Sequence, residues 1–218
     1  MAVRNSGVSD GPDAVAALLP LTPAVRDRLE AYVALVRRWQ EVKNLVAPST
    51  LPVIWSRHVA DSAQAHLAAP MARRWLDLGS GAGFPGLVTA ILIADEPGAA
   101  VTLVEANGRK AAFLMAVARE LRLPVKVISE RIESVAQRHA DIGAVDAVSA
   151  RALAGLPQLL AYAEPWLATG ALGVFHKGQD FGNECQDATH AWVFDLVKHP
   201  SRIEADSVVA VLSAVRRR

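Results

Sequence analysis

The sequence predicts an α/β fold in which a mainly parallel sheet is covered by helices on both faces and preceded by a helical cap. Three observations predict it. From residue 74 onward, short apolar runs alternate with helical segments, the rhythm of a parallel sheet with crossover helices. A glycine-rich segment, residues 77–86, overlaps the end of the first run. Before residue 70, apolar residues recur at helical spacing instead. We therefore expect a helical cap over residues 1–70 and an α/β domain over residues 71–218.

The N-terminal region begins with residues 1–11, which mix Gly, Ser, Asn and Asp and are expected to form a loose tail. Thr22 followed by Pro23 marks a helix start, with the threonine as N-cap and the proline in the first turn. Prolines near residue 50 interrupt the helical pattern, and a second helical stretch is expected over residues 53–67. The apolar face of the first helix is formed by side chains three or four residues apart: Val25, Leu29, Tyr32, Val33, Val36 and Trp39.

The α/β region contains five continuous apolar runs that we expect to be buried strands: residues 75–78, 101–104, 125–128, 144–148 and 171–175. Three helical segments lie between them: residues 87–94, 110–121 and 156–167. Strands that are apolar throughout, rather than at alternate positions, indicate a parallel sheet buried on both faces. The last part of the chain differs, because residues 191–198 and 208–215 predict two strands joined by a loop, an antiparallel pair that closes the sheet.

The composition of the chain restricts the classes of protein to which it can belong. The chain has 218 residues and a formal net charge of +1, so any nucleic-acid site is a local patch rather than a strongly basic surface. Cys185 is the single cysteine, which rules out an internal disulfide. The first 13 residues are polar, and the longest apolar stretch, residues 87–94, is far too short for a membrane span. We expect a soluble cytoplasmic protein.

The glycine-rich segment reads Asp77-Leu-Gly79-Ser-Gly81-Ala-Gly83-Phe-Pro-Gly86 and lies where a strand passes into a helix. Glycines there allow a sharp turn and a close approach of the backbone to a ligand. Two cofactor classes fit the loop. The last three glycines match the dinucleotide pattern G-x-G-x-x-G, and Glu105, at the end of the next strand, is a candidate ligand for ribose hydroxyls. An NAD(P)-dependent oxidoreductase is therefore one hypothesis.

Asp77 shifts the balance toward a different cofactor. A carboxylate two residues before the first glycine is poorly placed beside a pyrophosphate, because like charges repel. It suits a ligand that carries an ammonium and a sulfonium cation, or water bridging to them. S-adenosylmethionine is such a ligand, and it has no phosphates.

Further motifs flank the loop in a fixed order: Asn44-Leu45, His58-Val-Ala-Asp61-Ser62, Arg109-Lys110, Phe113-Leu114, Arg131-Ile-Glu133, Ser149-Ala-Arg151-Ala152 and Lys177-Gly178. Together with the loop and Glu105, they resemble the bacterial small-subunit ribosomal RNA guanine-N7 methyltransferases, a family also called methyltransferase G or glucose-inhibited division protein B. The resemblance runs from about Tyr32 to Gly178, and residues 179–218 match least.

The resemblance implies a class I S-adenosylmethionine-dependent methyltransferase fold, Rossmann-like, with a seven-stranded mixed sheet and a small helical N-terminal region. It implies methyl transfer to N7 of a guanine in the helix 18 loop of 16S rRNA. The near-neutral net charge favours RNA presented within the small ribosomal subunit or an assembly intermediate over naked RNA. The implied cofactor contacts are Gly79, Phe84, Ile132, Glu133 and Arg151. Asp77, Gly81 and Gly83 belong to the same loop, and Glu105 is the implied ribose ligand.

Several polar residues remain to be assigned. Arg151, Lys177 and Arg109 are candidate contacts to RNA phosphate, although arginines and lysines at such positions are often solvated. His58 and Asp61 share a helix face with Ser62, and a capping or docking network is favoured over a metal site because no matching ligand set appears.

N7 of guanine carries a lone pair and no proton, so we expect no catalytic acid or base. A monomer is the default. A non-catalytic RNA or ribosome-assembly factor on the same scaffold is a further alternative.

Overall fold

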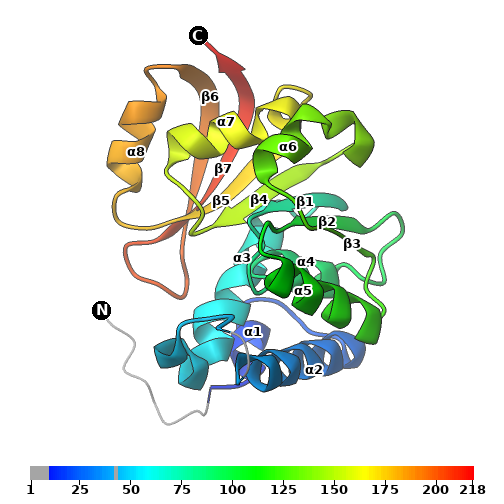
Figure 1. Cartoon of the computed structure of the whole chain (residues 1–218). Coiled ribbons are helices and arrows are strands. Elements are labelled where there is room, and N and C mark those ends of the chain that lie inside the picture. The colour runs from blue at the N-terminus through cyan, green and yellow to red at the C-terminus, as the bar shows by residue number, and fades with distance from the viewer. Residues whose placement is uncertain (1–9, 42–43) are drawn as a thin grey trace.

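The computed structural model describes residues 10–41 and 44–218, which form a seven-stranded sheet between two layers of helices (Figure 1). The strand order is β3-β2-β1-β4-β5-β7-β6. Neighbours among β1 to β5 pair in parallel, whereas β7 runs antiparallel to both β5 and β6. The predicted closing antiparallel pair is therefore confirmed. The strands are β1 (Arg74–Leu78), β2 (Ala100–Val104), β3 (Val125–Ile128), β4 (Ala147–Arg151), β5 (Leu172–Lys177), β6 (Trp192–Pro200) and β7 (Val208–Arg217).

The N-terminal region packs beneath the sheet as a set of short helices around one long one (Figure 1). Its elements are α1 (Asp13–Ala16), α2 (Pro23–Gln40), a 3₁₀ helix (Pro48–Val53), a π-helical turn (Trp55–Ala60) and α3 (Asp61–Ala68). The predicted start of α2 is confirmed, because the hydroxyl of Thr22 accepts a hydrogen bond from the Val25 N–H. The expected second helical stretch is present, but it changes from π-helix to α-helix at Asp61.

Part of the expected loose tail is held in place. Residues 1–9 lie outside the described part of the chain, but the carboxylate of Asp10 accepts hydrogen bonds from the N–H groups of Trp55 (2.8 Å) and Ser56 (2.9 Å). These N–H groups have no partner within the helix they open, and a carboxylate at that position satisfies them. Asp10 thus anchors the start of the π-helical turn that leads to the candidate site.

The lower helical layer also contains α4 (Gly86–Leu92) and α5 (Gly108–Glu120), and one apolar cluster joins both to the N-terminal helices. Tyr32 and Leu29 of α2 are fully buried in this cluster, as are Leu87 of α4 and Phe113 of α5. The described N-terminal region therefore shares its core with one face of the sheet. The division of the chain at residue 70 stays a prediction.

The upper layer holds α6 (Ile132–Gln137), α7 (Leu156–Leu167) and α8 (Phe181–Ala188), packed on a second apolar cluster. The sequence patterns missed α6 and α8, because each buries two side chains and has no long apolar face. The fourth strand was expected over residues 144–148 and lies instead at 147–151. Just before this strand, the Asp146 carboxylate accepts hydrogen bonds from the N–H groups of Arg73 and Arg74.

None of the helices in the described ranges, 10–41 and 44–218, combines the length and apolar character needed to cross a bilayer.

Candidate functional site

The glycine-rich loop connects β1 to α4 in a conformation that requires glycine. Gly79, Gly81 and Gly83 have φ values of 67°, 59° and 95°, in the left-handed region that other residues rarely adopt. A Cβ at Gly86 would come within 2.4 Å of Leu103 Cδ2 and 2.7 Å of Asp77 Oδ2, so the start of α4 needs glycine for close packing. A Cβ at Gly81 would meet no atom closer than 3.9 Å, which leaves the middle of the loop open to a ligand.

Asp77 supports this loop from behind. Its side chain is 1% exposed, and its Oδ1 accepts a 2.6 Å hydrogen bond from Ser149 Oγ on β4. Burial raises the pKa of Asp77 to about 6, although the hydrogen bond from Ser149 opposes the shift. The carboxylate thus links β1 to β4 through Oδ1, while its Oδ2 has no hydrogen-bond partner among the described residues. The role of Asp77 beside a cationic ligand stays a prediction, and from its buried position the carboxylate would act from beneath the loop.

Glu105 holds the loop from the neighbouring strand end. Its two carboxylate oxygens accept hydrogen bonds from the N–H groups of Gly81 (2.8 Å) and Asn107 (2.7 Å). Each carboxylate oxygen has two lone pairs, so both retain capacity for a hydroxyl donor. Glu105 is therefore positioned to fix the loop and to bind a polar ligand at the same time.

The turn formed by Ala82 and Phe84 is supported by aromatic side chains from the N-terminal region. Tyr32 of α2 donates a 2.7 Å hydrogen bond from its hydroxyl to the Ala82 carbonyl. The Phe84 ring lies 5.3 Å from the Tyr32 ring and stacks on His58, with centroids 5.0 Å apart and planes 22° apart. Tyr32 was predicted only as part of an apolar face. A buried tyrosine hydroxyl needs an acceptor, and that need was the available signal.

Arg151, the last residue of β4, is the centre of a polar network. Its guanidinium pairs with Asp61 Oδ2 at 3.1 Å, donates to His58 Nδ1 at 2.8 Å and lies over the Phe84 ring at 5.3 Å. It also donates to the Arg57 carbonyl. The predicted docking network of His58 and Asp61 is thus confirmed, since both side chains connect the N-terminal helices to β4. Ser62 lies outside it: its hydroxyl is fully buried and has no partner among the described residues.

Two histidines in this region are neutral. A guanidinium only donates, so His58 Nδ1 must accept and its Nε2 carries the hydrogen that faces Thr50 Oγ1 at 2.8 Å. Burial and the positive charges of Arg151 and Arg57 lower the pKa of His58 to about 4. Burial likewise lowers the pKa of His176, whose Nε2 donates to the Asp61 carbonyl at 2.9 Å. Neither imidazole is set up to take up a proton near neutral pH.

A cavity of about 310 Å³ opens where β4 and β5 end, next to this network. Its walls come from the π-helical turn and α3, from the ends of the two strands, and from the β6–β7 loop. Lys177, the last residue of β5, donates to the Ala154 carbonyl at 2.9 Å and pairs with Glu184 at 2.5 Å. The lining residues are Arg57, His58, Asp61, Arg151, Ala152, His176, Lys177, Gly178, Ser201, Glu204, Ser207 and Val208.

Gln64 ties the β6–β7 loop to the polar network. This buried side chain donates from Nε2 to Asp61 Oδ1 and to Ser201 Oγ, both at 3.1 Å, while its Oε1 accepts from the Arg202 N–H at 2.7 Å. Glu204 of the same loop forms an ion pair with Arg57. No sequence pattern pointed to Gln64, because Ser201 and Arg202, the partners through which it holds the β6–β7 loop, lie more than 130 positions away in the chain.

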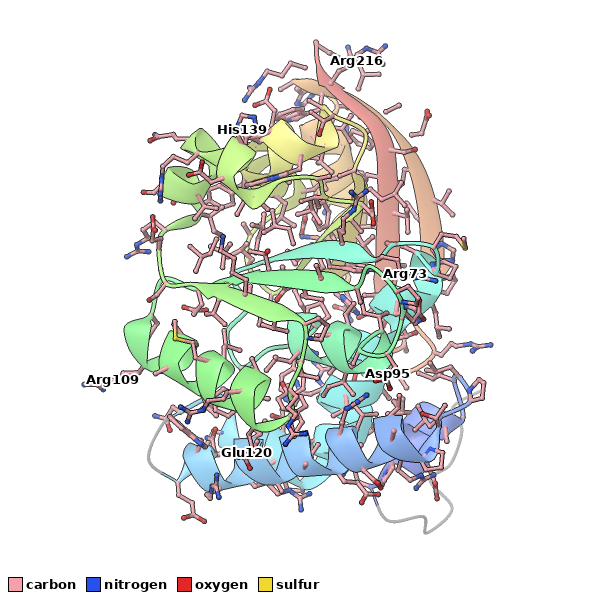
Figure 2. The ribbon with its side chains drawn as sticks, turned by 90° about the vertical axis from the view of Figure 1, so that its right-hand side faces the viewer. Arg73, Asp95, Arg109, Glu120, His139 and Arg216 are labelled. Carbon is pink, nitrogen blue, oxygen red and sulfur yellow. The ribbon has the colours of Figure 1, made fainter. Side chains whose placement is uncertain are left out.

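The structure brings most of the predicted site residues to the carboxyl ends of the parallel strands. Ile132 is buried at the start of α6, after β3, and the adjacent Glu133 is exposed. Arg151 and Lys177 line one cavity. Arg109 is not among its lining residues; it lies at the outer end of α5 and points away from the protein (Figure 2). Among residues 10–41 and 44–218, no three His, Cys, Asp or Glu side chains are grouped to bind a metal ion.

The reversed β7 next to β5, together with the glycine loop after β1, defines the class I fold of S-adenosylmethionine-dependent methyltransferases. A family model described as rRNA small subunit methyltransferase G, GidB, matches residues 26–207. The chain belongs to this family. Curated relatives named ribosomal RNA small subunit methyltransferase G agree: the Brucella canis protein is 47% identical over 205 residues, which cover 92% of this chain and 95% of the relative. The Brucella ovis protein is 46% identical over the same shares of both chains.

Solved structures share the fold at low sequence identity. The O-methyltransferase TomG of Streptomyces achromogenes, solved with S-adenosylmethionine, has a TM-score of 0.60 and 15% identity, over 93% of this chain and 95% of TomG. An O-methyltransferase of Bacillus cereus, solved with S-adenosylhomocysteine (SAH), has a TM-score of 0.57 and 13% identity, over 93% and 96% of the two chains. Both similarities cover most of this chain.

Proposed function

We propose that this protein uses S-adenosylmethionine to methylate N7 of a guanine in the helix 18 loop of 16S rRNA. Family membership supports rRNA methylation. The observation that carries the proposal is the arrangement at the strand ends, where the open glycine loop held by Glu105 adjoins a cavity lined by Arg57, Arg151 and Lys177. Each of these cations is paired with a carboxylate, and together they give the cavity a polar wall of hydrogen-bond donors beside the cofactor loop, which suits a small-molecule donor and an RNA acceptor.

The residues present fit the proposed cofactor. Gly81 leaves open space above the loop, and Glu105 has lone pairs left for ribose hydroxyls. Gly79, Gly83 and Phe84 would complete the loop side of the pocket, with Ile132 and Glu133 at the end of β3 on the adenine side. When bound, S-adenosylmethionine supplies a methyl group activated by its sulfonium.

The chain's own residues orient the reactants and take no part in proton transfer. The N7 atom attacks with a lone pair and loses no proton, so the reaction needs no general base. A weak proton acceptor is sufficient for this mechanism: the pKa values of His58 and His176 are lowered by burial, and Asp61 is already paired with Arg151. Positioning alone is worth roughly 7–11 kcal/mol in favourable cases. Arg151 joins the two sides, because it contacts Phe84 of the loop and lines the cavity.

Calorimetry with the purified protein tests the cofactor first. We expect S-adenosylmethionine to bind at micromolar concentration and NADH not to bind. Absence of S-adenosylmethionine binding at millimolar concentration would overturn the proposal and favour a non-catalytic assembly factor, whereas binding of NADH alone would favour the oxidoreductase. Retention of N7-methylguanosine in the helix 18 loop of 16S rRNA from cells that lack this protein would refute the proposed target.

A further inference from the structure

Guanine and adenine both present N7 as an acceptor, so an enzyme that methylates N7 has to distinguish the purines elsewhere on the base. This inference rests on the proposed function. The two bases differ at their Watson–Crick edges, where guanine offers donors at N1 and N2 and adenine offers a lone pair at N1. Proteins that bind unpaired RNA bases commonly hydrogen-bond to this edge. The cavity therefore needs an acceptor that guanine satisfies and adenine does not.

An ionised carboxylate meets that requirement, because it only accepts hydrogen bonds and its two oxygens match the paired N1–H and N2–H donors. It also repels the N1 lone pair of adenine, which adds discrimination by an unfavourable contact. Two carboxylates are among the described residues that line the cavity: Asp61 and Glu204.

Asp61 is already engaged. Its Oδ2 pairs with Arg151 and its Oδ1 accepts from Gln64, and its side chain is only 12% exposed. Turning it toward a base would leave the charge of Arg151 without its carboxylate partner in a largely buried position, which is costly. Asp61 is better assigned to holding the cavity wall together.

Glu204 is accessible and sits on a backbone that is held in place. Its side chain is 39% exposed and pairs with Arg57, which lines the same cavity. The Glu204 N–H donates to Ser201 Oγ, and Gln64 binds that same hydroxyl and the Arg202 N–H. Each carboxylate oxygen has two lone pairs, so the contact with Arg57 can persist while the carboxylate accepts from a base.

We propose that Glu204 is a specificity-determining residue, which accepts the N1–H and N2–H donors of the target guanine and so selects guanine over adenine. Arg57 holds the carboxylate toward the cavity, and Gln64 and Ser201 hold the loop that carries it. The arrangement leaves N7, on the opposite edge of the base, free to face the methyl donor.

The test asks whether the effect of replacing Glu204 depends on the N2 amino group of the target base. Small subunits are reconstituted with guanosine or inosine at the target position, since inosine lacks only the N2 amino group. We expect inosine to lower kcat/KM of the wild-type protein about tenfold or more. Glu204→Ala should lower kcat/KM on guanosine by a similar factor, leave the Kd for S-adenosylmethionine unchanged and abolish the penalty for inosine. A purely structural defect would lower kcat/KM by the same factor on the guanosine and the inosine substrate.

Glu164→Ala is the matched control, because Glu164 also pairs with an exposed arginine, Arg217, and does not line the cavity. It should keep the wild-type penalty for inosine. If Glu204→Ala fails to fold, Glu204→Gln replaces it; the amide presents a donor to one of the guanine donors and should likewise remove most of the penalty. An inosine penalty as large in the Glu204 variants as in the wild type would overturn the inference. Wild-type methylation at another atom of the guanosine substrate would instead refute the proposed function.

Discussion

Arg151 donates a 2.8 Å hydrogen bond to Nδ1 of His58, and this contact joins the end of β4 to the π-helical turn before α3. The bond exists only while His58 is neutral, because a protonated imidazole has no acceptor. The wall of the cavity therefore depends on an uncharged histidine beside two arginines, Arg57 and Arg151. Its sensitivity to acid follows from this dependence.

His58 should make the folded state less stable as the solution is acidified. Its folded pKa, about 4, lies below the value of 6.5 for an exposed histidine, so the unfolded chain binds a proton that the folded protein does not. The contribution of His58 is complete above pH 6.5 and is lost as the pH falls toward 4. Urea unfolding of wild type and His58→Gln between pH 4 and 7 measures it. The two free energies of unfolding should converge at low pH, and a constant difference would contradict the assignment.

Asp77 should have the opposite dependence. Its folded pKa, about 6, lies above the ordinary 3.8, so ionisation costs stability as the pH rises from about 4 to 6. A shift of two units corresponds to about 3 kcal/mol at most. Asp77→Asn keeps an acceptor for Ser149 and has no charge to bury. The free energy of unfolding of the variant minus that of wild type should therefore be larger at pH 7 than at pH 4. Urea unfolding of both proteins at the two pH values measures this difference. An equal difference at pH 4 and pH 7 would contradict the predicted cost of ionising Asp77.

Gly81→Ala should weaken cofactor binding while leaving the fold intact. Positive φ costs a non-glycine residue about 1–2 kcal/mol, but the new Cβ meets no protein atom closer than 3.9 Å. It projects instead into the open middle of the loop. Calorimetry should give a Kd for S-adenosylmethionine raised tenfold or more. Gly98→Ala, with φ of 78° at the parent glycine and open space around it, is the control and should lose comparable stability without any change in Kd.

Gln64→Leu should impair binding of RNA more than binding of cofactor. Losing its hydrogen bonds to Asp61, Ser201 and Arg202 frees the β6–β7 loop from Asp61, so KM for the small subunit should rise about tenfold. The Kd for S-adenosylmethionine should stay near the wild-type value. Gln40→Leu is the matched control, since Gln40 makes three hydrogen bonds to the backbone of Leu45 and Val46. Steady-state kinetics would contradict the role of Gln64 if both variants raised KM equally.

The strands and the cofactor loop were accessible from the sequence because each leaves a local signal. Buried runs such as residues 101–104 are apolar throughout, and the spacing of glycines marks a turn with positive φ. The strand whose bounds were predicted wrongly is β4. β4 contains Ser149 and ends at Arg151, and these polar residues do not look like a strand. Ser149 is tolerated in the core because Asp77 accepts its hydroxyl hydrogen.

The cavity was less accessible, because its walls are built from contacts between distant segments. Arg151 meets His58 across 93 positions, and Gln64 meets Arg202 across 138. No periodicity or spacing encodes such pairs. Asp77 is almost fully buried beneath the loop, so its predicted place beside a cationic ligand stays a prediction. Local chemistry thus suggested which residues matter, and the topology determined what they touch.

The most direct test of the central claim is methylation of small subunits that lack the modification. Purified protein, S-adenosylmethionine and subunits from cells without this gene are combined, and nuclease fragments of the 16S rRNA are mapped by mass spectrometry. We predict one new N7-methylguanosine, located in the helix 18 loop, and none when the cofactor is omitted. A methyl group on another nucleotide or another atom, or no transfer by a protein that binds the cofactor, would contradict the account.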